Sequence, residues 1–299
     1  ADTGIYSQKF DGAGNPAGGG IRLTTELSTA SRWTNVTALG DGQYVVTWPN
    51  HGDETVRAQI FGADGHAIGS EIVAGTGYQE NGLQPLGVTL LSDGKFVIVW
   101  PVPGDDGSGD VRAQLFNADG STFGDAFRVN SHTLFVQTNS KLSALPGGGF
   151  VVTWESLQQE GDQRGVYAQL FDGSGNPIGG ETQVATNIDF EQSGQTVTAL
   201  TGGGYVITWI SDDGSSTGIH SQVFDADGGK VGVQTGVNTT TDDKQYEQDV
   251  VALPNGGFAV SWVSMVGVNR ERLLQPMAAE GHKVGGETRV SAGGRGSEA

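Results

Sequence analysis

Short, almost continuously apolar runs recur along this chain, and each has the length of a β-strand. One run has the form (Phe/Tyr)-x-x-x-Trp and occurs five times, at Tyr44–Trp48, Phe96–Trp100, Phe150–Trp154, Tyr205–Trp209 and Phe258–Trp262. A second run, close to Val-x-Ala-Gln-x-Phe-Asp, occurs six times, centred on Gln8, Gln59, Gln114, Gln169, Gln222 and Gln275. The glutamines follow one another at intervals of 51 to 55 residues. A fixed period of about fifty residues is typical of arrays, solenoids and propellers.

Each repeat predicts four strands, which we call A to D. A further apolar run ends five residues before each aromatic-Trp run, at Leu39, Leu91, Leu145, Leu200 and Leu253. The turn between these two runs is rich in glycine, as in residues 147–149. A turn such as Asp64-Gly65 and another short strand follow each Gln run. Asp and Asn side chains stabilise tight turns and Gly permits positive φ, so these connections indicate antiparallel hairpins.

The apolar pattern favours an all-β fold. Glycine accounts for 50 of the 299 residues, and no stretch of eleven residues has apolar positions at helical spacing. Strands such as Phe150–Trp154 are apolar on both faces, which indicates sheets that are covered on both sides. The sequence therefore predicts a β-propeller of five or six four-stranded antiparallel blades. A linear stack of β-sheets is the alternative.

The repeats predict a single repeat domain over residues 1–299. It consists of a half-unit at 1–25, repeats at about 33–73, 86–129, 141–184, 196–237 and 249–290, and a tail at 291–299. The chain has six C–D pairs but only five A–B pairs, because it opens in the middle of a unit. The half-unit either closes the ring against the last A–B pair and displaces residues 272–290, or docks on a neighbouring molecule.

The composition of the chain limits the classes of molecule that it is expected to bind. The formal net charge is −18, which disfavours nucleic acid and anionic membranes and favours cations. No cysteine is present, and no apolar run of eighteen residues predicts membrane insertion. An acidic, glycine-rich repeat chain without cysteine is typical of a secreted or cell-surface bacterial protein.

The B–C loops carry the candidate metal ligands. Length variation between repeats is confined to these loops, and insertions in repeat proteins gather on one face that is often the binding face. Calcium takes six to eight oxygen ligands, which Asp-rich and Gly-rich loops can supply. The candidate calcium ligands are Asp105, Asp106, Asp110, Asp212 and Asp213. Acidic loops that are merely solvated have the same sequence, and turn chemistry accounts for Asp64, Asp119 and Asp227 without a ligand.

Aromatic residues in the D–A connections are candidates for glycan binding. They are Tyr78, Phe135, Phe190 and Tyr246, and an exposed ring offers an apolar face to a sugar. Their distances to the next repeat leucine differ between repeats, which favours packing between neighbouring blades as their role. The repeated Trp and Gln residues are better explained by structure, as core side chains and as buried amides that hydrogen-bond a repeated partner.

No local catalytic signature is present. The five histidines occupy unrelated repeat positions, and His-x-x-x-His does not occur. The many acids make any chosen carboxylate pair uninformative. We therefore expect no enzyme, although an active site assembled across blades would leave no local signature.

The repeat itself resembles a known family. Residues 148–154 and 166–172, followed by Asp172–Glu181, resemble repeats in large secreted bacterial proteins of the haemolysin-type calcium-binding (RTX) and adhesin kind. The resemblance implies export, a calcium-rich extracellular setting, and a segment of a longer protein. The calcium nonapeptide Gly-Gly-x-Gly-x-Asp does not form an array; only Gly293–Glu298 is similar, with Glu in place of Asp.

The leading functional prediction is a non-enzymatic extracellular module with a structural or adhesive role, self-associating through its unpaired half-unit or joined to neighbouring domains. The first alternative is a lectin-like propeller that binds a glycan. The second is a polysaccharide-degrading enzyme on a propeller scaffold.

Overall fold

The computed structural model describes residues 5–17, 19–23, 33–78, 86–159, 161, 163–186, 190–242, 244–266 and 269–291. Regular structure in these ranges consists of strands, apart from the short 3₁₀ turn η1 at Gly40–Gly42. No helix within the described ranges is long and apolar enough to cross a membrane. The prediction of an all-β fold is confirmed.

The strands form five four-stranded antiparallel sheets and one two-stranded hairpin. The sheets are called blade 1 to blade 5 in chain order. The first strands are β3 (Asn35–Ala38), β7 (Gly87–Leu90), β11 (Gln137–Ala144), β15 (Ser193–Ala199) and β19 (Gln245–Ala252). The second strands are β4 (Tyr44–Asn50), β8 (Phe96–Val102), β12 (Phe150–Leu157), β16 (Tyr205–Asp212) and β20 (Phe258–Val266).

The third and fourth strands complete each blade in the order of the chain. The third strands are β5 (Thr55–Phe61), β9 (Asp110–Phe116), β13 (Arg164–Phe171), β17 (Thr217–Phe224) and β21 (Asn269–Met277). The fourth strands are β6 (Ala67–Thr76), β10 (Thr122–Arg128), β14 (Pro177–Gln183), β18 (Lys230–Gly236) and β22 (Thr288–Ser291). The two-stranded hairpin consists of β1 (Tyr6–Ser7) and β2 (Ile21–Arg22).

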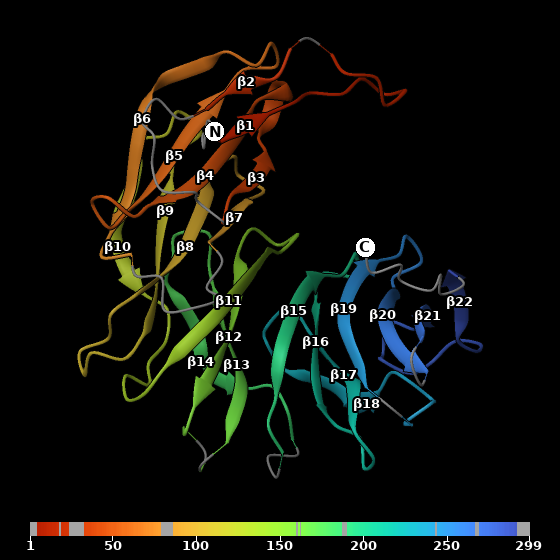
Figure 1. The fold of residues 1–299 in the computed structure, drawn as a ribbon. Coiled ribbons are helices and arrows are strands. Elements are labelled where there is room, and N and C mark those ends of the chain that lie inside the picture. The colour runs from red at the N-terminus through yellow and green to blue at the C-terminus, as the bar shows by residue number, and fades with distance from the viewer. Residues whose placement is uncertain are drawn as a thin grey trace.

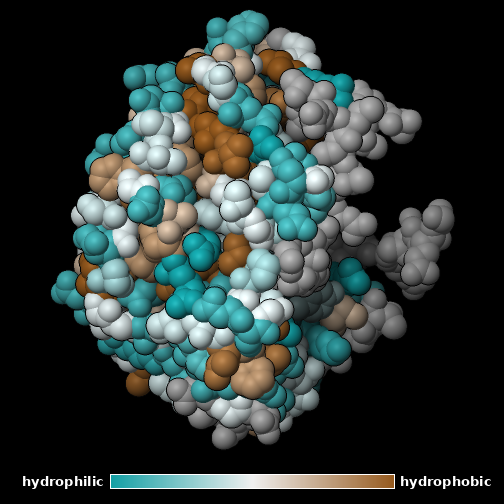
Figure 2. Space-filling view, turned by 90° about the vertical axis from the view of Figure 1, so that its left-hand side faces the viewer, coloured by the Kyte–Doolittle hydropathy of each residue, from teal (hydrophilic) through white to brown (hydrophobic). Residues whose placement is uncertain are grey.

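The blades follow one another around a common centre, as Figure 1 shows from blade 1 in orange to blade 5 in blue. The first strands of neighbouring blades contact one another, so they lie innermost. The predicted β-propeller is therefore confirmed, and a linear stack of sheets is not needed. Figure 2, a side view, shows a mainly hydrophilic surface on which apolar residues form small separate groups.

The core lies between blades. Four apolar clusters join blades 1 and 2, 2 and 3, 3 and 4, and 4 and 5, and each contains the Trp of its later blade. Inside a blade, the aromatic residue that begins the second strand stacks on the Phe that ends the third, as Phe150 does on Phe171 with ring centroids 5.1 Å apart. The repeated Trp is thus an inter-blade core residue, as predicted.

The repeated Gln holds a kink in the outermost strand. In blade 3, the Gln169 side-chain amide donates to the carbonyls of Leu170 (2.9 Å) and Ile178 (3.1 Å). The register of β13 and β14 shifts at this point, and Gly179 adopts φ 66°. Gln59, Gln114, Gln222 and Gln275 make the equivalent pair of bonds. The predicted structural role of these glutamines is confirmed.

The B–C loops and the D–A connections share one face of the propeller. Backbone hydrogen bonds join them across blades, from Tyr78 N to Glu54 O (2.8 Å), from Gln137 N to Gly109 O (2.9 Å) and from Gln192 N to Arg164 O (2.9 Å). The turns on the other face are built as their sequence predicts. Asp64 and Asp119 each accept a backbone N–H two residues further on. We call the surface formed by the B–C loops and the D–A connections the B–C face.

The half-unit at the N-terminus packs on blade 1. Leu23 joins Val46, Trp48 and Phe61 in one apolar cluster, against which Ile21 of β2 packs. The third and fourth strands of blade 5 remain paired with β20, so residues 272–290 are not displaced from their own blade. The prediction that the half-unit pairs with the last A–B pair and displaces residues 272–290 is therefore wrong as regards the displacement.

Candidate functional site

One blade interface departs from the repeat. The residue after the repeated Trp is Pro49, Pro101, Glu155, Ile210 and Val263 in blades 1 to 5. Glu155 is only 3 % exposed, so a carboxylate occupies a position where the other blades place an apolar side chain. Burying a charge costs free energy unless partners surround it, so this departure is the first sign of a site.

Glu155 is held by three donors. Its Oε1 accepts hydrogen bonds from the Asn139 side-chain amide (2.8 Å) and from the Gly194 backbone N–H (2.7 Å), and Gly194 belongs to blade 4. Its Oε2 accepts a bond from Arg164 Nη1 at 2.8 Å. Charge-assisted bonds of this length are stronger than neutral ones, so the carboxylate is fixed between blades 3 and 4.

Two strand bulges create these donors. The pairing of β11 with β12 shifts register between Thr138 and Lys141, and Asn139 adopts φ 53° in the bulge. The first strand of blade 4 has the equivalent bulge, where Gly194 adopts φ 63°. Gln195 then donates from its side chain to Asn139 O at 2.5 Å and links the two bulges. Bulges redirect backbone and side chains beside functional sites.

A lysine lies in the same interface. Lys141 follows the bulge of β11, and burial lowers the pKa of its amine below the ordinary value of 10.5, while the negative charge of Glu155 opposes that shift. The corresponding residues in blades 1, 2, 4 and 5 are Asn35, Gly87, Thr196 and Asp249, so a positive charge is specific to blade 3. The interface therefore combines a buried carboxylate, a half-buried amine and a guanidinium.

Arg164 connects this interior to the surface. Its Nε lies 3.4 Å from Glu191 Oε1, while its Nη1 contacts Glu155. Glu191 lines a pocket of about 240 Å³ on the B–C face, together with Phe190, Asp212 and several hydroxyl residues. The other lining residues are Ser193, Ile210, Ser211, Ser216 and Thr217. Two carboxylates, an aromatic ring and several hydroxyl groups thus surround a cavity that a sugar ring can enter.

The predicted calcium ligands lie in two loops. The Ser108 hydroxyl donates a hydrogen bond to Asp106 and is the largest cause of the lowered pKa of this carboxyl. The backbone N–H groups of Ser108 and Phe135 also donate to Asp106 and lower its pKa further. Asp110 is buried and accepts from Asn130 (2.7 Å), whereas Asp105 is exposed and pairs with Arg128 (3.1 Å).

In blade 4, Asp213 accepts from Asn238 at 3.1 Å, and Asp212 accepts from Gly214 N at 2.8 Å. Among the described residues, no group of three or more His, Asp or Glu side chains is arranged to hold a metal ion. Glu160 and Asp162, acids of the blade 3 loop, lie outside the described residues. Calcium binding stays a prediction.

The four predicted aromatic residues divide into two groups. Phe135 and Phe190 are 44 % and 43 % exposed. Each lies ten residues before the leucine that directly follows the first strand of its blade. They therefore occupy equivalent places on blades 3 and 4. Tyr246 lies half-buried in β19 with its hydroxyl on Met265 Sδ. Tyr78 is 1 % exposed inside the cluster between blades 1 and 2 and offers no ring face to a ligand.

Phe190 and Asp212 were predicted from the sequence, whereas the charged residues around them were not. Glu155, Arg164 and Glu191 come from β12, β13 and the connection that leads into β15, and only the packing of blade 4 on blade 3 brings them together. A comparison of equivalent repeat positions would have found Glu155, because it replaces the proline or apolar residue of the other blades.

Comparisons with known proteins identify fold relatives. No protein-family model and no curated protein sequence matches the chain. An α-L-arabinanase from Penicillium chrysogenum, solved with arabinobiose, is similar over 85 % of this chain and 80 % of its own, with a TM-score of 0.57 and 14 % identity. A polysaccharide lyase described as an ulvan lyase of family PL25 covers 83 % and 68 %, with a TM-score of 0.58 and 11 % identity.

A third solved structure is the GH93 α-L-arabinofuranosidase of Fusarium graminearum, also with arabinobiose. It covers 86 % of this chain and 79 % of its own, with a TM-score of 0.52 and 12 % identity. At such low identity these likenesses establish the fold and do not transfer an activity. The three proteins are nevertheless enzymes of glycans built on the same architecture.

These findings correct three predictions. The structural relatives are carbohydrate-active propellers, so the assignment to haemolysin-type and adhesin repeats is wrong. The predictions of a non-enzymatic structural or adhesive module, and of no enzyme, are wrong for the same reason. Those predictions rested on the absence of a local catalytic motif. A propeller assembles its site from loops of different blades, and such a site has no contiguous motif.

Proposed function

We propose that this protein is a polysaccharide-degrading enzyme whose active site is the pocket on the B–C face of blade 4, beside its interface with blade 3. The observation that carries the proposal is the ion pair of buried Glu155 with Arg164. The same arginine contacts Glu191, which lines the pocket. A buried ion pair is weak evidence for stability, because an apolar side chain of similar size stabilises a core at least as well. A second buried carboxylate, Asp110, lies 3.6 Å from Arg128 in blade 2, but the Glu155 pair differs because its arginine also contacts a residue that lines the pocket, which is better explained by function.

The reaction that this pocket supports best is hydrolysis of a glycosidic bond. Glu191 and Asp212 are carboxylates that line the same cavity, which is the pair of groups that such hydrolysis requires. One of them, as an acid, protonates the departing glycosidic oxygen while the bond from that oxygen to the anomeric carbon breaks. The other, as a carboxylate, takes a proton from the water that attacks this carbon.

The remaining residues bind and orient. The exposed ring of Phe190 offers an apolar face on which a sugar can stack, and Ser216 and Thr217 offer hydroxyl groups to hydrogen-bond it. Arg164 is a positioning residue, because its guanidinium fixes Glu191 through Nε while Glu155 fixes the guanidinium.

The test is release of reducing sugar from a panel of neutral and acidic polysaccharides. We expect Glu191→Gln and Asp212→Asn each to lower turnover by a factor of about 10² or more, since general acid–base catalysis contributes 10²–10⁴. Asp227→Asn, in an exposed turn on the opposite face, is the matched control and should keep full activity. Equal activity in all three variants, or no turnover of any glycan, would refute the proposal.

A second function, glycan binding without cleavage, is favoured by one observation. Phe135 and Phe190 are exposed at equivalent places on adjacent blades, so one glycan can contact both rings across the B–C face. Saturable binding of a polysaccharide that Phe135→Ala and Phe190→Ala both weaken, with no product formed, would support it. Secretion to the extracellular space or the bacterial cell surface fits either function and stays a prediction.

A further inference from the structure

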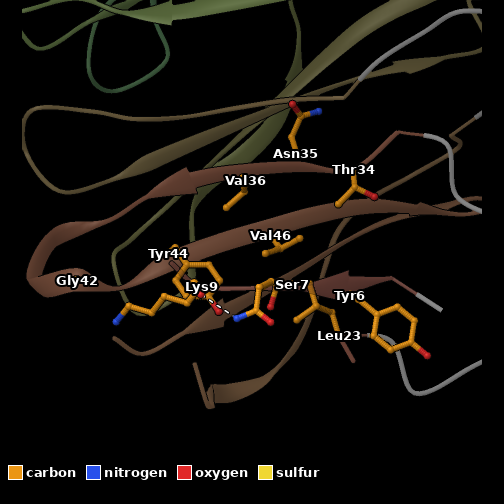
Figure 3. A pocket seen from close by; sticks show the side chains of 11 residues that line it. Tyr6, Ser7, Lys9, Leu23, Thr34, Asn35, Val36, Gly42, Tyr44 and Val46 are labelled. Atoms are coloured by element: carbon orange, nitrogen blue, oxygen red, sulfur yellow. Dashed lines mark hydrogen bonds between the residues drawn. The ribbon is translucent and has the colours of Figure 1, made fainter. Parts of the chain in front are cut away.

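A groove beside the half-unit has the form of an unfilled blade interface. It encloses about 410 Å³ and is lined by β3 and β4 of blade 1 and by β1. Figure 3 shows Val36 and Val46 from the blade beside Ser7, Lys9 and Leu23 from the half-unit. Lys9 Nζ donates to Ala63 O at 2.5 Å and helps to hold the hairpin on blade 1.

The four complete interfaces show what normally fills this space. Three residues before the leucine that directly follows the first strand stand Val36, Val88, Leu142, Val197 and Val250 in blades 1 to 5. The last four pack in the clusters between blades, with Val197 and Val250 each 7 % exposed. Val36 is 66 % exposed. The groove is thus the place where a preceding blade would cover blade 1.

The half-unit supplies only part of that cover. β1 is followed directly by the repeated Gln8 and therefore corresponds to a third strand, and β2 corresponds to a fourth strand. They cover Val46, Trp48 and Phe61 of blade 1 but leave Val36 open. The missing elements are the first and second strands, and all five such pairs in the described chain belong to complete blades.

We propose that this groove binds a β-hairpin with the repeat's own A–B pattern, carried by a polypeptide segment other than the five pairs within this chain. The occupant completes a sixth blade around β1 and β2. In blade 4 the equivalent hairpin is β15–β16. There, Val206 and Ile210 pack in the cluster that covers Val250, and Thr198 Oγ1 donates to Val250 O at 3.1 Å. On blade 1, the hairpin makes the same contacts with Val36.

The chemistry of the occupant follows from those contacts. Its first strand carries a hydroxyl residue two positions before the turn leucine. Its second strand begins with an aromatic residue and presents alternate Val or Ile side chains to blade 1. A sheet edge and an apolar face together give affinity through backbone bonds and specificity through side chains.

The test appends residues 193–212 to the C-terminus of the full chain through a flexible linker, which raises the effective concentration of the hairpin. We expect the thermal midpoint to rise by about 3 °C or more, with slower amide exchange in β3. The same hairpin with Val206→Asp should give no rise. The free peptide should bind the untethered chain saturably.

Val36→Glu should abolish both the rise in thermal midpoint and the binding of the free peptide. It should leave the thermal midpoint of the chain without the appended hairpin unchanged, because the Val36 side chain is exposed. Val233→Glu, at an 80 % exposed valine of β18, is the matched control and should keep them. No rise in midpoint, or a rise that survives Val36→Glu, would overturn the proposal. A concentration-dependent dimer of the untethered chain that Val36→Glu disperses would assign the groove to a second copy instead.

Discussion

Replacing the charged interface of blade 3 with that of blade 4 separates function from stability. The graft is Glu155→Ile with Arg164→Thr, because Ile210 and Thr217 occupy these positions in blade 4. The comparison variant is Glu155→Gln, which keeps the shape and removes the charge. Both variants should lose activity, because the graft removes the guanidinium that orients Glu191 and Glu155→Gln removes the charge that holds this guanidinium in place.

Their stabilities should differ. Breaking one partner of a buried ion pair costs about 3–5 kcal/mol, and the partial exposure of Arg164 reduces this to about 2 kcal/mol for Glu155→Gln. The graft removes both charges and buries an isoleucine. It leaves the Gly194 N–H and the Asn139 amide without their acceptor, at about 1 kcal/mol each. Burial of the isoleucine offsets most of this cost, so the free energy of unfolding should stay within about 1 kcal/mol of the parent.

Urea unfolding followed by tryptophan fluorescence measures both values, provided that the m-values agree. Reducing-sugar release measures activity in the same preparations. If the graft destabilises the protein as much as Glu155→Gln or more, the ion pair is a structural element and its use as evidence for a site is mistaken. If the graft keeps full activity, Arg164 does not position Glu191.

Three further predictions follow. Gln222→Leu should lower the free energy of unfolding by about 2 kcal/mol in urea, because two strand carbonyls lose their donor; Gln234→Leu, on a half-buried strand position, should cost less. Burial lowers the pKa of His220 below 6.5, so the unfolded chain takes up the proton first and stability falls as pH drops below 6.5; His220→Phe should reduce that fall, and an unchanged pH profile would contradict this. Calcium at millimolar concentration should raise the thermal midpoint, less so in Asp106→Asn, and EDTA should reverse it; no shift would remove the predicted site.

The local pattern of residues was sufficient to predict the strands of each blade but not the contacts between blades. The five aromatic-Trp runs are the second strands, and the Gln runs are the third strands, as the periodicity predicted. The repeated Gln could be assigned a structural role because a buried amide needs partners within its own sheet. Tyr78 packs between blades, which is the role that the sequence favoured for the four aromatic residues, so it is not a glycan-binding residue; the sequence could not separate it from Phe135 and Phe190, because its burial depends on a neighbouring blade.

The sequence by itself therefore determined the repeat, the strands, their antiparallel order and the composition of the inter-blade core, because these depend on residues close together in the chain. The tertiary structure alone decided which exceptional residues meet. Glu155, Arg164 and Glu191 converge because blade 4 packs on blade 3, and Val36 is exposed because the half-unit beside blade 1 does not cover it. Both outcomes depend on contacts between repeats about fifty residues apart, which no local pattern encodes.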